Sequence, residues 1–158
     1  MNTQEQNTPE AQQALVQEAL VRAEKLRKKK DYKQAIELLV EALQYGIDKG
    51  TIYYRLGNVY IDGADLARAE YAYKRALDID PHYVNAMHNL AIVYKRQKKT
   101  SLYVKTYKKS QRMQLRHARK QKLTPQQKTR LRRLSFKTML YMFLGLGAIA
   151  IILILLFR

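Results

Sequence analysis

The feature that most constrains this chain is an uncharged apolar segment, residues 138–157, which reads TMLYMFLGLGAIAIILILLF. An α-helix of this length rises ~30 Å, which is the thickness of the hydrocarbon core of a bilayer. A helix also satisfies its own backbone hydrogen bonds in that environment. A chain of 158 residues offers no second apolar surface able to surround such a helix. The sequence therefore predicts a C-terminal transmembrane helix rather than a buried core helix.

Charge is unevenly distributed along the chain. All 13 acidic residues lie before residue 81, whereas 18 of the 30 Lys and Arg residues lie after residue 80. Thirteen of these basic residues lie between Leu102 and Lys137, and only Arg158 follows the apolar segment. The positive-inside rule places the more basic flank on the cytoplasmic side. We therefore expect a single-pass protein with a cytoplasmic N-terminal domain, inserted after synthesis because its anchor is C-terminal.

The residue inventory argues against catalysis and metal binding. Cysteine is absent, which excludes disulfides, thiolate nucleophiles and cysteine metal sites. His82, His88 and His117 form no HExxH pair, and the chain has no Gly-rich phosphate loop and no GxSxG motif. Asp62 and Asp65 belong to an expected turn, where acids are normally solvated. We therefore expect no enzymatic activity, no cofactor and no metal.

A 34-residue period runs through residues 16–117. The middle unit reads Leu56-Gly57-x-x-Tyr60, followed by Ala69, Tyr73, Ala76 and Pro81. The same pattern returns one period later as Leu90-Ala91-x-x-Tyr94 with Tyr107, and one period earlier as Ala23-x-x-Leu26 with Ala35, Leu39 and Ala42. This pattern resembles the tetratricopeptide repeat family, whose units are pairs of antiparallel helices. The resemblance implies three units, about 16–49, 50–83 and 84–117, in a repeat domain of residues 9–117 that follows a disordered polar tail, residues 1–8.

The unit boundaries have physical reasons. Small residues such as Gly57 let two helices approach closely, and Pro81 ends the second helix of its unit because it cannot continue the hydrogen-bond ladder. The expected turns are Lys30-Asp31, Gly63-Ala64 and Lys98-Lys99. The outer units depart from the family at Arg22, where Leu is usual, and at Tyr103 and Ser110, where small residues are usual; Tyr107 is expected to fill a core position.

The resemblance also implies a concave groove, lined by the first helix of each unit, that binds a protein or peptide. The matching positions are Gln17, Leu20, Glu24, Arg27, Tyr54, Asn58, Ile61, Asn85, His88, Asn89, Ile92 and Lys95. Asn58 and Asn89 match asparagines that hold a peptide's terminal carboxylate in chaperone-binding members, but Tyr54 stands where those members have Lys. A groove for an extended or helical peptide and the narrower carboxylate clamp are both open at this point.

A basic connector, residues 118–137, is expected between the repeats and the apolar segment. Thr124-Pro125-x-Gln127 is a capping sequence that predicts a helix start, and no breaker follows before residue 138. The residues expected to face anionic headgroups are Arg116, Arg119, Lys120, Lys122, Lys128, Arg130, Arg132, Arg133 and Lys137. Each basic side chain near such a surface contributes ~1 kcal/mol. Nucleic acid and an acidic partner are the alternatives, and nucleic acid is less favoured because a core Tyr107 could not stack on bases.

The sequence thus predicts an all-α chain, made of a short repeat solenoid, a basic connector and one C-terminal transmembrane helix. The expected function is a non-enzymatic, membrane-anchored adaptor that binds a protein partner at the cytoplasmic membrane face. One alternative is a membrane-tethered nucleic-acid binder. Another is a mitochondrial outer-membrane adaptor, because the layout is similar to that of the tail-anchored fission adaptor. That family carries several basic residues after its anchor, whereas this chain has Arg158 alone, which favours a bacterial plasma membrane.

Overall fold

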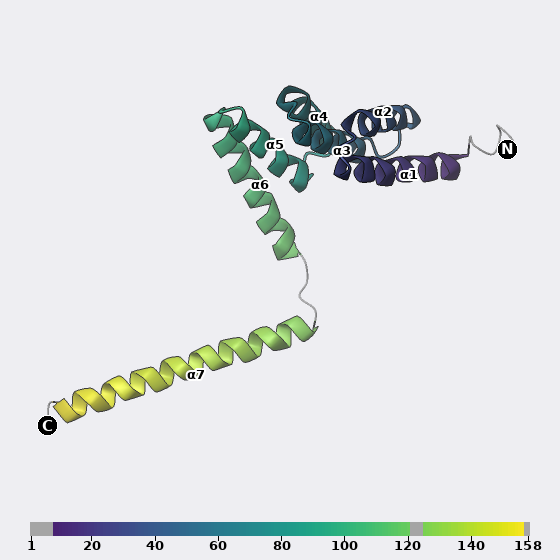
Figure 1. Ribbon diagram of the computed structural model, residues 1–158. Helices are drawn as coiled ribbons and strands as arrows, with labels where there is room; N and C mark the ends of the chain where they lie inside the picture. Colours follow the sequence, from purple (N-terminus) through teal and green to yellow (C-terminus); the bar gives the residue numbers. More distant parts are fainter. Residues whose placement is uncertain (1–7, 121–124, 157–158) are drawn as a thin grey trace. The chain divides into compact units, whose positions relative to one another are not determined.

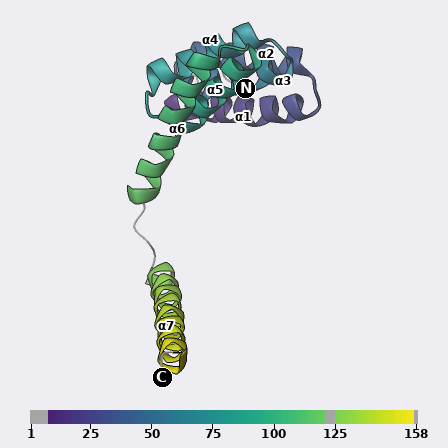
Figure 2. The ribbon, with the colours of Figure 1, turned by 90° about the vertical axis from the view of Figure 1, so that its left-hand side faces the viewer.

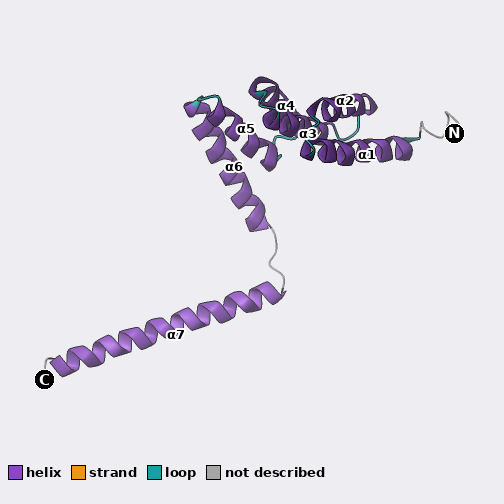
Figure 3. Ribbon diagram, in the orientation of Figure 1, coloured by secondary structure: helices purple, strands orange, loops and turns teal. Residues whose placement is uncertain are grey.

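The computed structural model describes the backbone of residues 8–120 and 125–156, with side chains over residues 8–116 and at most positions from 126 to 146. Its elements are α1 (Pro9–Lys28), α2 (Tyr32–Ala42), the 3-10 helix η2 (Leu43–Tyr45), α3 (Lys49–Asp62), α4 (Leu66–Ile79), α5 (Val84–Arg96), α6 (Thr100–Lys120) and α7 (Pro125–Leu156). Figure 3 shows helices and loops and, within the described residues, no strand. The expectation of an all-α protein is confirmed. The chain divides into two compact units, residues 1–117 and 118–158.

The first unit is a series of helical hairpins. α1 packs on α2, α3 on α4, and α2 and α4 each pack on the first helix of the following hairpin. The first helices of the hairpins also contact one another in order, α1 with α3 and α3 with α5. Figures 1 and 2 show this succession from two sides. Because α1, α3 and α5 are neighbours, they form one continuous layer, which is the layer that the family resemblance assigns to the groove.

The three turns within the hairpins repeat with the sequence period. Lys30, Ala64 and Lys98, each one period from the next, have positive φ angles of 65°, 62° and 60°. A positive φ is uncommon for residues other than glycine, so its recurrence marks equivalent turns. After the first two turns, the side chains of Asp31 and Asp65 cap the following helix by accepting a hydrogen bond from a backbone N–H three residues later. The turns predicted at these places are confirmed.

One prediction for the third hairpin is wrong. Leu39 and Tyr73 occupy equivalent positions in the first two hairpins and are fully buried, but Tyr107, their equivalent in α6, is 36% exposed. Tyr73 is covered by the next hairpin, since Asn89 of α5 reaches its hydroxyl. Tyr107 belongs to the last of the three hairpins and has no such cover from residues 8–116. Ser110, in contrast, is fully buried like the equivalent Ala76, and its hydroxyl donates to a backbone carbonyl of α6.

The last two helices depart from the expected boundaries. α6 has 21 residues, against 11 in α2 and 14 in α4, and it includes residues 118–120 of the predicted connector. α7 begins at Pro125, as the capping sequence predicts; Thr124 itself lies outside the described residues. From Pro125, α7 continues for 32 residues, so one helix runs from the basic connector into the predicted span.

Within the described residues, none of the helices combines the length and the apolar character needed to cross a membrane. Residues 147–157 of the predicted span lie outside the described side chains.

Candidate protein-binding groove

Polar contacts join α1, α3 and α5 at equivalent positions. Arg27 of α1 forms an ion pair with Asp62 of α3, 35 residues later. At the next step of the series, Arg96 of α5 donates from Nη1 to the backbone oxygen of Ile61, again 35 residues apart, at 3.2 Å. The two contacts link the C-terminal ends of successive first helices. They fix the spacing of the helices that line the predicted groove.

A charged network lies between α1 and α3. Glu24 accepts from Nη2 of Arg27 at 2.8 Å and from Nη1 of Arg55 at 3.1 Å. The hydrogen bonds from Arg27, together with the charges of Arg27 and Arg55, lower the pKa of Glu24 and outweigh the effect of partial burial. The hydrogen bond to Glu24 likewise raises the pKa of Arg27 above its usual value. Glu24 and Arg27 are therefore ionised and held by each other, and they are half-buried.

An amide network takes the place of this charged network between α3 and α5. Nδ2 of Asn89 donates to Oδ1 of Asn58 at 3.0 Å, across the same separation of 31 residues that joins Glu24 to Arg55. The hydroxyl of Tyr73 donates to the same oxygen at 2.8 Å. Burial raises the pKa of Tyr73, so the hydroxyl keeps its proton and acts as the donor. Since Oδ1 of Asn58 accepts both bonds, its Nδ2 group is the one left to meet a ligand.

Aromatic side chains gather at the third hairpin. The ring of His88 lies 5.9 Å from the ring of Tyr107. Tyr54 and Tyr73 occupy the equivalent positions one period earlier, and their rings are 6.1 Å apart. Tyr103 lies 5.6 Å from Tyr107, and Nζ of Lys95 stands 5.9 Å from the Tyr103 ring. His88 and Lys95 therefore face α6, at the C-terminal end of the repeat series. Nδ1 of His88 is buried without a hydrogen-bond partner among the described residues.

The predicted groove residues differ in exposure. Gln17, Asn85 and Lys95 are exposed, whereas the half-buried positions are Glu24, Arg27, Tyr54, Asn58, Ile61, His88, Asn89 and Ile92. The prediction that Leu20 lines the groove is wrong, because Leu20 is 6% exposed and belongs to the core cluster that α1 forms with α2 and α3. It is not available to a ligand.

Sequence reasoning missed several residues of this layer. Arg55, Asp62 and Arg96 were not predicted, yet each joins one first helix to the next. A signal was present in the sequence, because these contacts recur at separations of 31 and 35 residues. Residues so spaced fall on neighbouring first helices, since both separations are close to the repeat period. Comparing such pairs for opposite charge or amide character would have found them.

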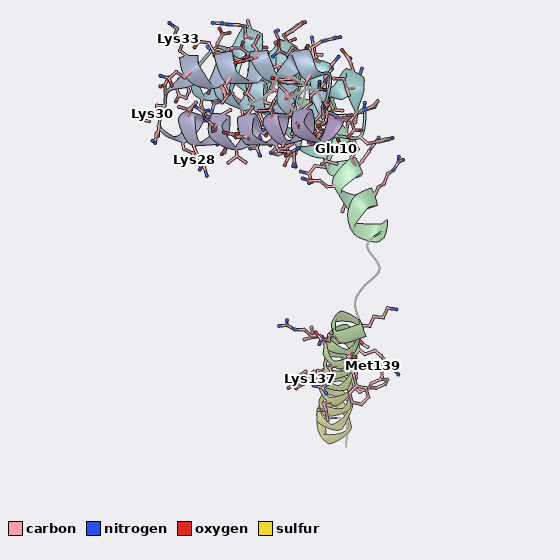
Figure 4. All side chains as sticks on the ribbon, turned by 90° about the vertical axis from the view of Figure 1, so that its right-hand side faces the viewer. Glu10, Lys28, Lys30, Lys33, Lys137 and Met139 are labelled. Atoms are coloured by element: carbon pink, nitrogen blue, oxygen red, sulfur yellow. The ribbon has the colours of Figure 1, made fainter. Side chains whose placement is uncertain are left out.

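The basic residues predicted to face a membrane are exposed wherever their side chains are described. These are Arg116, Lys128, Arg130, Arg132, Arg133 and Lys137. Arg119, Lys120 and Lys122 lie outside the described side chains. In Figure 4, Lys137 and Met139 lie close together on α7, where basic residues give way to apolar ones. In the repeat domain, the same figure shows Lys28, Lys30 and Lys33 gathered at the α1–α2 turn, at the other end of α1 from Glu10. No group of three His, Asp or Glu side chains in the described parts of the chain could hold a metal ion.

This architecture, helical hairpins stacked at a fixed period with one continuous layer of first helices, defines a helical-repeat protein. Two family models, both described as tetratricopeptide repeat, match the chain, one over residues 50–83 and the other over residues 72–102. The matches support the tetratricopeptide repeat family for these hairpins. A search of curated proteins finds no match to the chain. Repeats of this family generally bind protein partners, and proteins built from them are generally scaffolds rather than enzymes.

Proposed function

We propose that this protein is a membrane-anchored adaptor that holds a protein partner in the groove formed by α1, α3 and α5. The family matches support protein binding as the role of the repeats. The groove supplies an exposed polar group on Asn85 and an amide donor on Asn58. Gln17 is exposed as well, but its Nε2 donates to Asp48 at 2.7 Å. The half-buried ion pairs of the groove are also satisfied. A partner segment that offers backbone or side-chain acceptors suits this surface, and a terminal carboxylate is one such acceptor.

The observation that carries the proposal of anchoring is the exposed apolar surface of α7. Six large apolar residues close together on α7, Met139, Tyr141, Met142, Phe143, Leu144 and Leu146, are between 50% and 70% exposed. Residues this close in sequence point to every side of a helix, so the apolar surface is not a stripe for one neighbour. A helix that is apolar all round belongs in a protein core or a membrane. The sequence continues in the same character to residue 157, which supports the membrane.

The basic segment before the apolar residues supports a cytoplasmic orientation of the repeat domain. Attraction of ~1 kcal/mol for each Lys or Arg near anionic headgroups would hold the first turns of α7 at the surface. In this orientation the repeat domain stands in the cytoplasm, on the same side of the membrane as the basic segment. The partner would then be recruited to the cytoplasmic face of that membrane.

Fractionation of cells that express the full chain tests the anchor. We expect the protein to stay in the membrane pellet after washes with high salt and alkaline carbonate, and a variant lacking residues 138–158 to become soluble. A variant in which Lys128, Arg130, Arg132 and Arg133 are all Gln separates the apolar anchor from the attraction to headgroups. Because its apolar segment is intact, it should stay in the pellet after the carbonate wash as well as the wild type does. If the truncated chain still pellets after both washes, the anchor assignment is wrong.

Protection from protease tests the orientation. Protease added outside sealed, right-side-out vesicles should leave the repeat domain intact, and detergent should expose it. Digestion without detergent contradicts a cytoplasmic repeat domain.

Nucleic-acid binding is the second candidate because one observation favours it. Tyr107, on the basic helix α6, is exposed rather than buried, so part of its ring is open to a base. Binding of duplex DNA by the full chain should then weaken with salt, with a log–log slope of ~0.9 per phosphate neutralised. The adaptor proposal expects weak binding from charge alone, lost near physiological salt. Tight binding at physiological salt that is lost on changing Arg112 and Arg116 to Gln would favour this candidate.

A further inference from the structure

The N-terminal end of the repeat series is closed by polar residues. In each later hairpin, three residues of the first helix pack against the preceding hairpin and are nearly fully buried. In α3 they are Ile52, Leu56 and Val59, and in α5 they are Ala86, Leu90 and Val93. The equivalent residues of α1 are Glu18, Arg22 and Lys25, and all three are exposed. No further helix is needed before α1, because the face that would receive it is already polar.

The C-terminal end of the series is not closed in this way. At the position where Leu39 and Tyr73 are fully buried under the next hairpin, Tyr107 is 36% exposed. Val104 is equivalent to Ile36, which packs against the core, and it is 41% exposed. Ile92 is equivalent to Glu24 and Asn58, the residues that bind the following first helix, and it is apolar and half-buried. This end thus exposes apolar side chains at positions that contact the following hairpin elsewhere in the series.

The same end carries a basic residue at a position that binds an acid in the first hairpin. Lys95 is equivalent to Arg27, which pairs with Asp62 of the following first helix. Lys108 and Arg112 of α6 are also exposed, and no acidic residue follows Asp80 in the chain. A helix that completes the series should therefore bring an acidic residue to Lys95 and an apolar residue to Ile92 and Tyr107.

We propose that a helix of a protein partner, apolar on one face and acidic toward its C-terminal end, packs on the C-terminal end of the repeats as the next helix of the series. The inference rests on the protein-binding function proposed above, and it adds a contact surface beyond the groove. The chain's own residues 121–137 cannot supply the acid, because they contain none. A second copy fits less well, since its α1 offers Glu18, Arg22 and Lys25 where apolar residues are needed, and two C-terminal ends would repel each other.

A synthetic helix can serve as the probe. The peptide has the sequence of α5, residues 84–96, with three changes. Asn89→Leu in the peptide is meant to contact Ile92 of the protein. Lys95→Gln and Arg96→Asp in the peptide supply the acid that is meant to contact Lys95 of the protein. The peptide is stapled on its outer face, because a helix of 13 residues is marginal in water. The full-length protein is held in detergent micelles, and binding of labelled peptide is followed by fluorescence anisotropy. A control peptide keeps the same charge but has Ser at its apolar positions.

Wild-type protein should bind the probe and not the control peptide. Tyr107→Lys and Val104→Lys should each weaken binding by at least ~10-fold, as expected for central apolar contacts. Tyr71→Lys, a change at a tyrosine of α4 that is 61% exposed, should leave binding unchanged. Circular dichroism melting of each variant verifies that it remains folded, and two independent variants guard against one that does not.

A charge exchange makes the test specific. Lys95→Glu in the protein should weaken binding of the probe by up to ~5-fold, which is the range for an exposed ion pair. A peptide that retains Arg96 should bind this protein variant more tightly than it binds the wild-type protein. Equal binding of the probe by wild type, Tyr107→Lys and Val104→Lys would overturn the inference. Self-association of the protein that disappears in Tyr107→Lys would assign this end to a second copy instead. Photocrosslinking from position 85 of the groove is a separate test of the proposed function, so failure here is distinguishable from failure of that function.

Discussion

The ring of Tyr73 lies so close to Gly57 that a Cβ atom on Gly57 would stand 2.5 Å from Cε1 of the ring. Atoms Cδ1 and Cζ of the same ring would lie within 2.8 Å. This contact lets α3 and α4 approach closely, and it brings the Tyr73 hydroxyl to the Asn58 side chain on the groove layer. The absence of one Cβ atom therefore positions a groove residue as well as a helix pair.

Gly57→Ala should destabilise the repeat domain. The added methyl group must displace the Tyr73 ring, and overpacking of this kind typically costs ~1–3 kcal/mol. Gly50→Ala is the matched control within α3, since its Cβ would meet Ile79 at an ordinary 3.4 Å and its backbone would lose less entropy on folding. Urea unfolding of both variants gives the comparison. Equal stability of the two would contradict the close contact.

A smaller residue at position 73 should relieve the strain. The first hairpin has Ala23 and Leu39 at the positions equivalent to Gly57 and Tyr73, and both are buried there. Tyr73→Leu should therefore cost clearly less stability in a Gly57→Ala background than in the wild type. A double-mutant cycle measures this coupling, which for residues in contact reaches ~0.5–3 kcal/mol. Additive effects would mean that the two side chains do not compete for the same space.

The Tyr73 hydroxyl should contribute to stability through its bond to Asn58. Tyr73→Phe removes one buried hydrogen bond, and we expect a loss of ~0.5–1.5 kcal/mol. Tyr71→Phe on the same helix should have no effect, because Tyr71 is exposed. Thermal or urea unfolding distinguishes the two. A Tyr73→Phe variant as stable as the wild type would argue that the amide pair of Asn58 and Asn89 needs no third partner.

Part of the stability at low pH should depend on Glu70. Burial alone would raise the pKa of Glu70, but its bonds to Lys74 at 2.6 Å and Lys99 at 2.8 Å hold the pKa at about 2. A carboxylate with a depressed folded-state pKa stabilises the protein above its unfolded-state pKa near 4.5, and the contribution is lost as pH falls toward 2. Glu70→Gln should therefore show a shallower loss of stability over this range, whereas Glu41→Gln, at an exposed position of α2, should follow the wild type. Parallel curves for wild type and Glu70→Gln would contradict the prediction.

The fold was predictable from the sequence because its signals are local and periodic. The middle unit, residues 50–83, has small, aromatic and helix-ending residues at fixed spacing between Leu56 and Pro81, and the hairpins follow that spacing. Tyr107 was mispredicted for a tertiary reason. Its burial depends on a following hairpin, so its family position alone could not decide it. The prediction for Leu20 was wrong for a similar reason, because α1 turns the Leu20 side chain toward the core rather than toward the groove.

The groove was predictable only in part. The family resemblance located its helices, but not how their side chains are satisfied. Asn58 is engaged by Tyr73 and Asn89, and Arg27 by Asp62, through contacts between separate helices. Such contacts join residues 31 or 35 positions apart, and the repeat pattern alone does not say which of the pairs at these separations meet. The exposed Asn85 is consequently a better place to probe binding than the paired residues, among them Gln17, whose Nε2 donates to Asp48.

The proposed adaptor holds a protein partner in its groove while its C-terminal segment anchors the chain. Photocrosslinking in intact cells tests partner binding and anchoring at once. The crosslinker p-benzoylphenylalanine replaces either Asn85 on α5 or Tyr71 on α4, and both positions are exposed. We expect a discrete protein adduct in the membrane fraction from position 85 and not from position 71, and the adduct should leave that fraction when residues 138–158 are deleted. No adduct from position 85, or equal adducts from both positions, would contradict the proposed function.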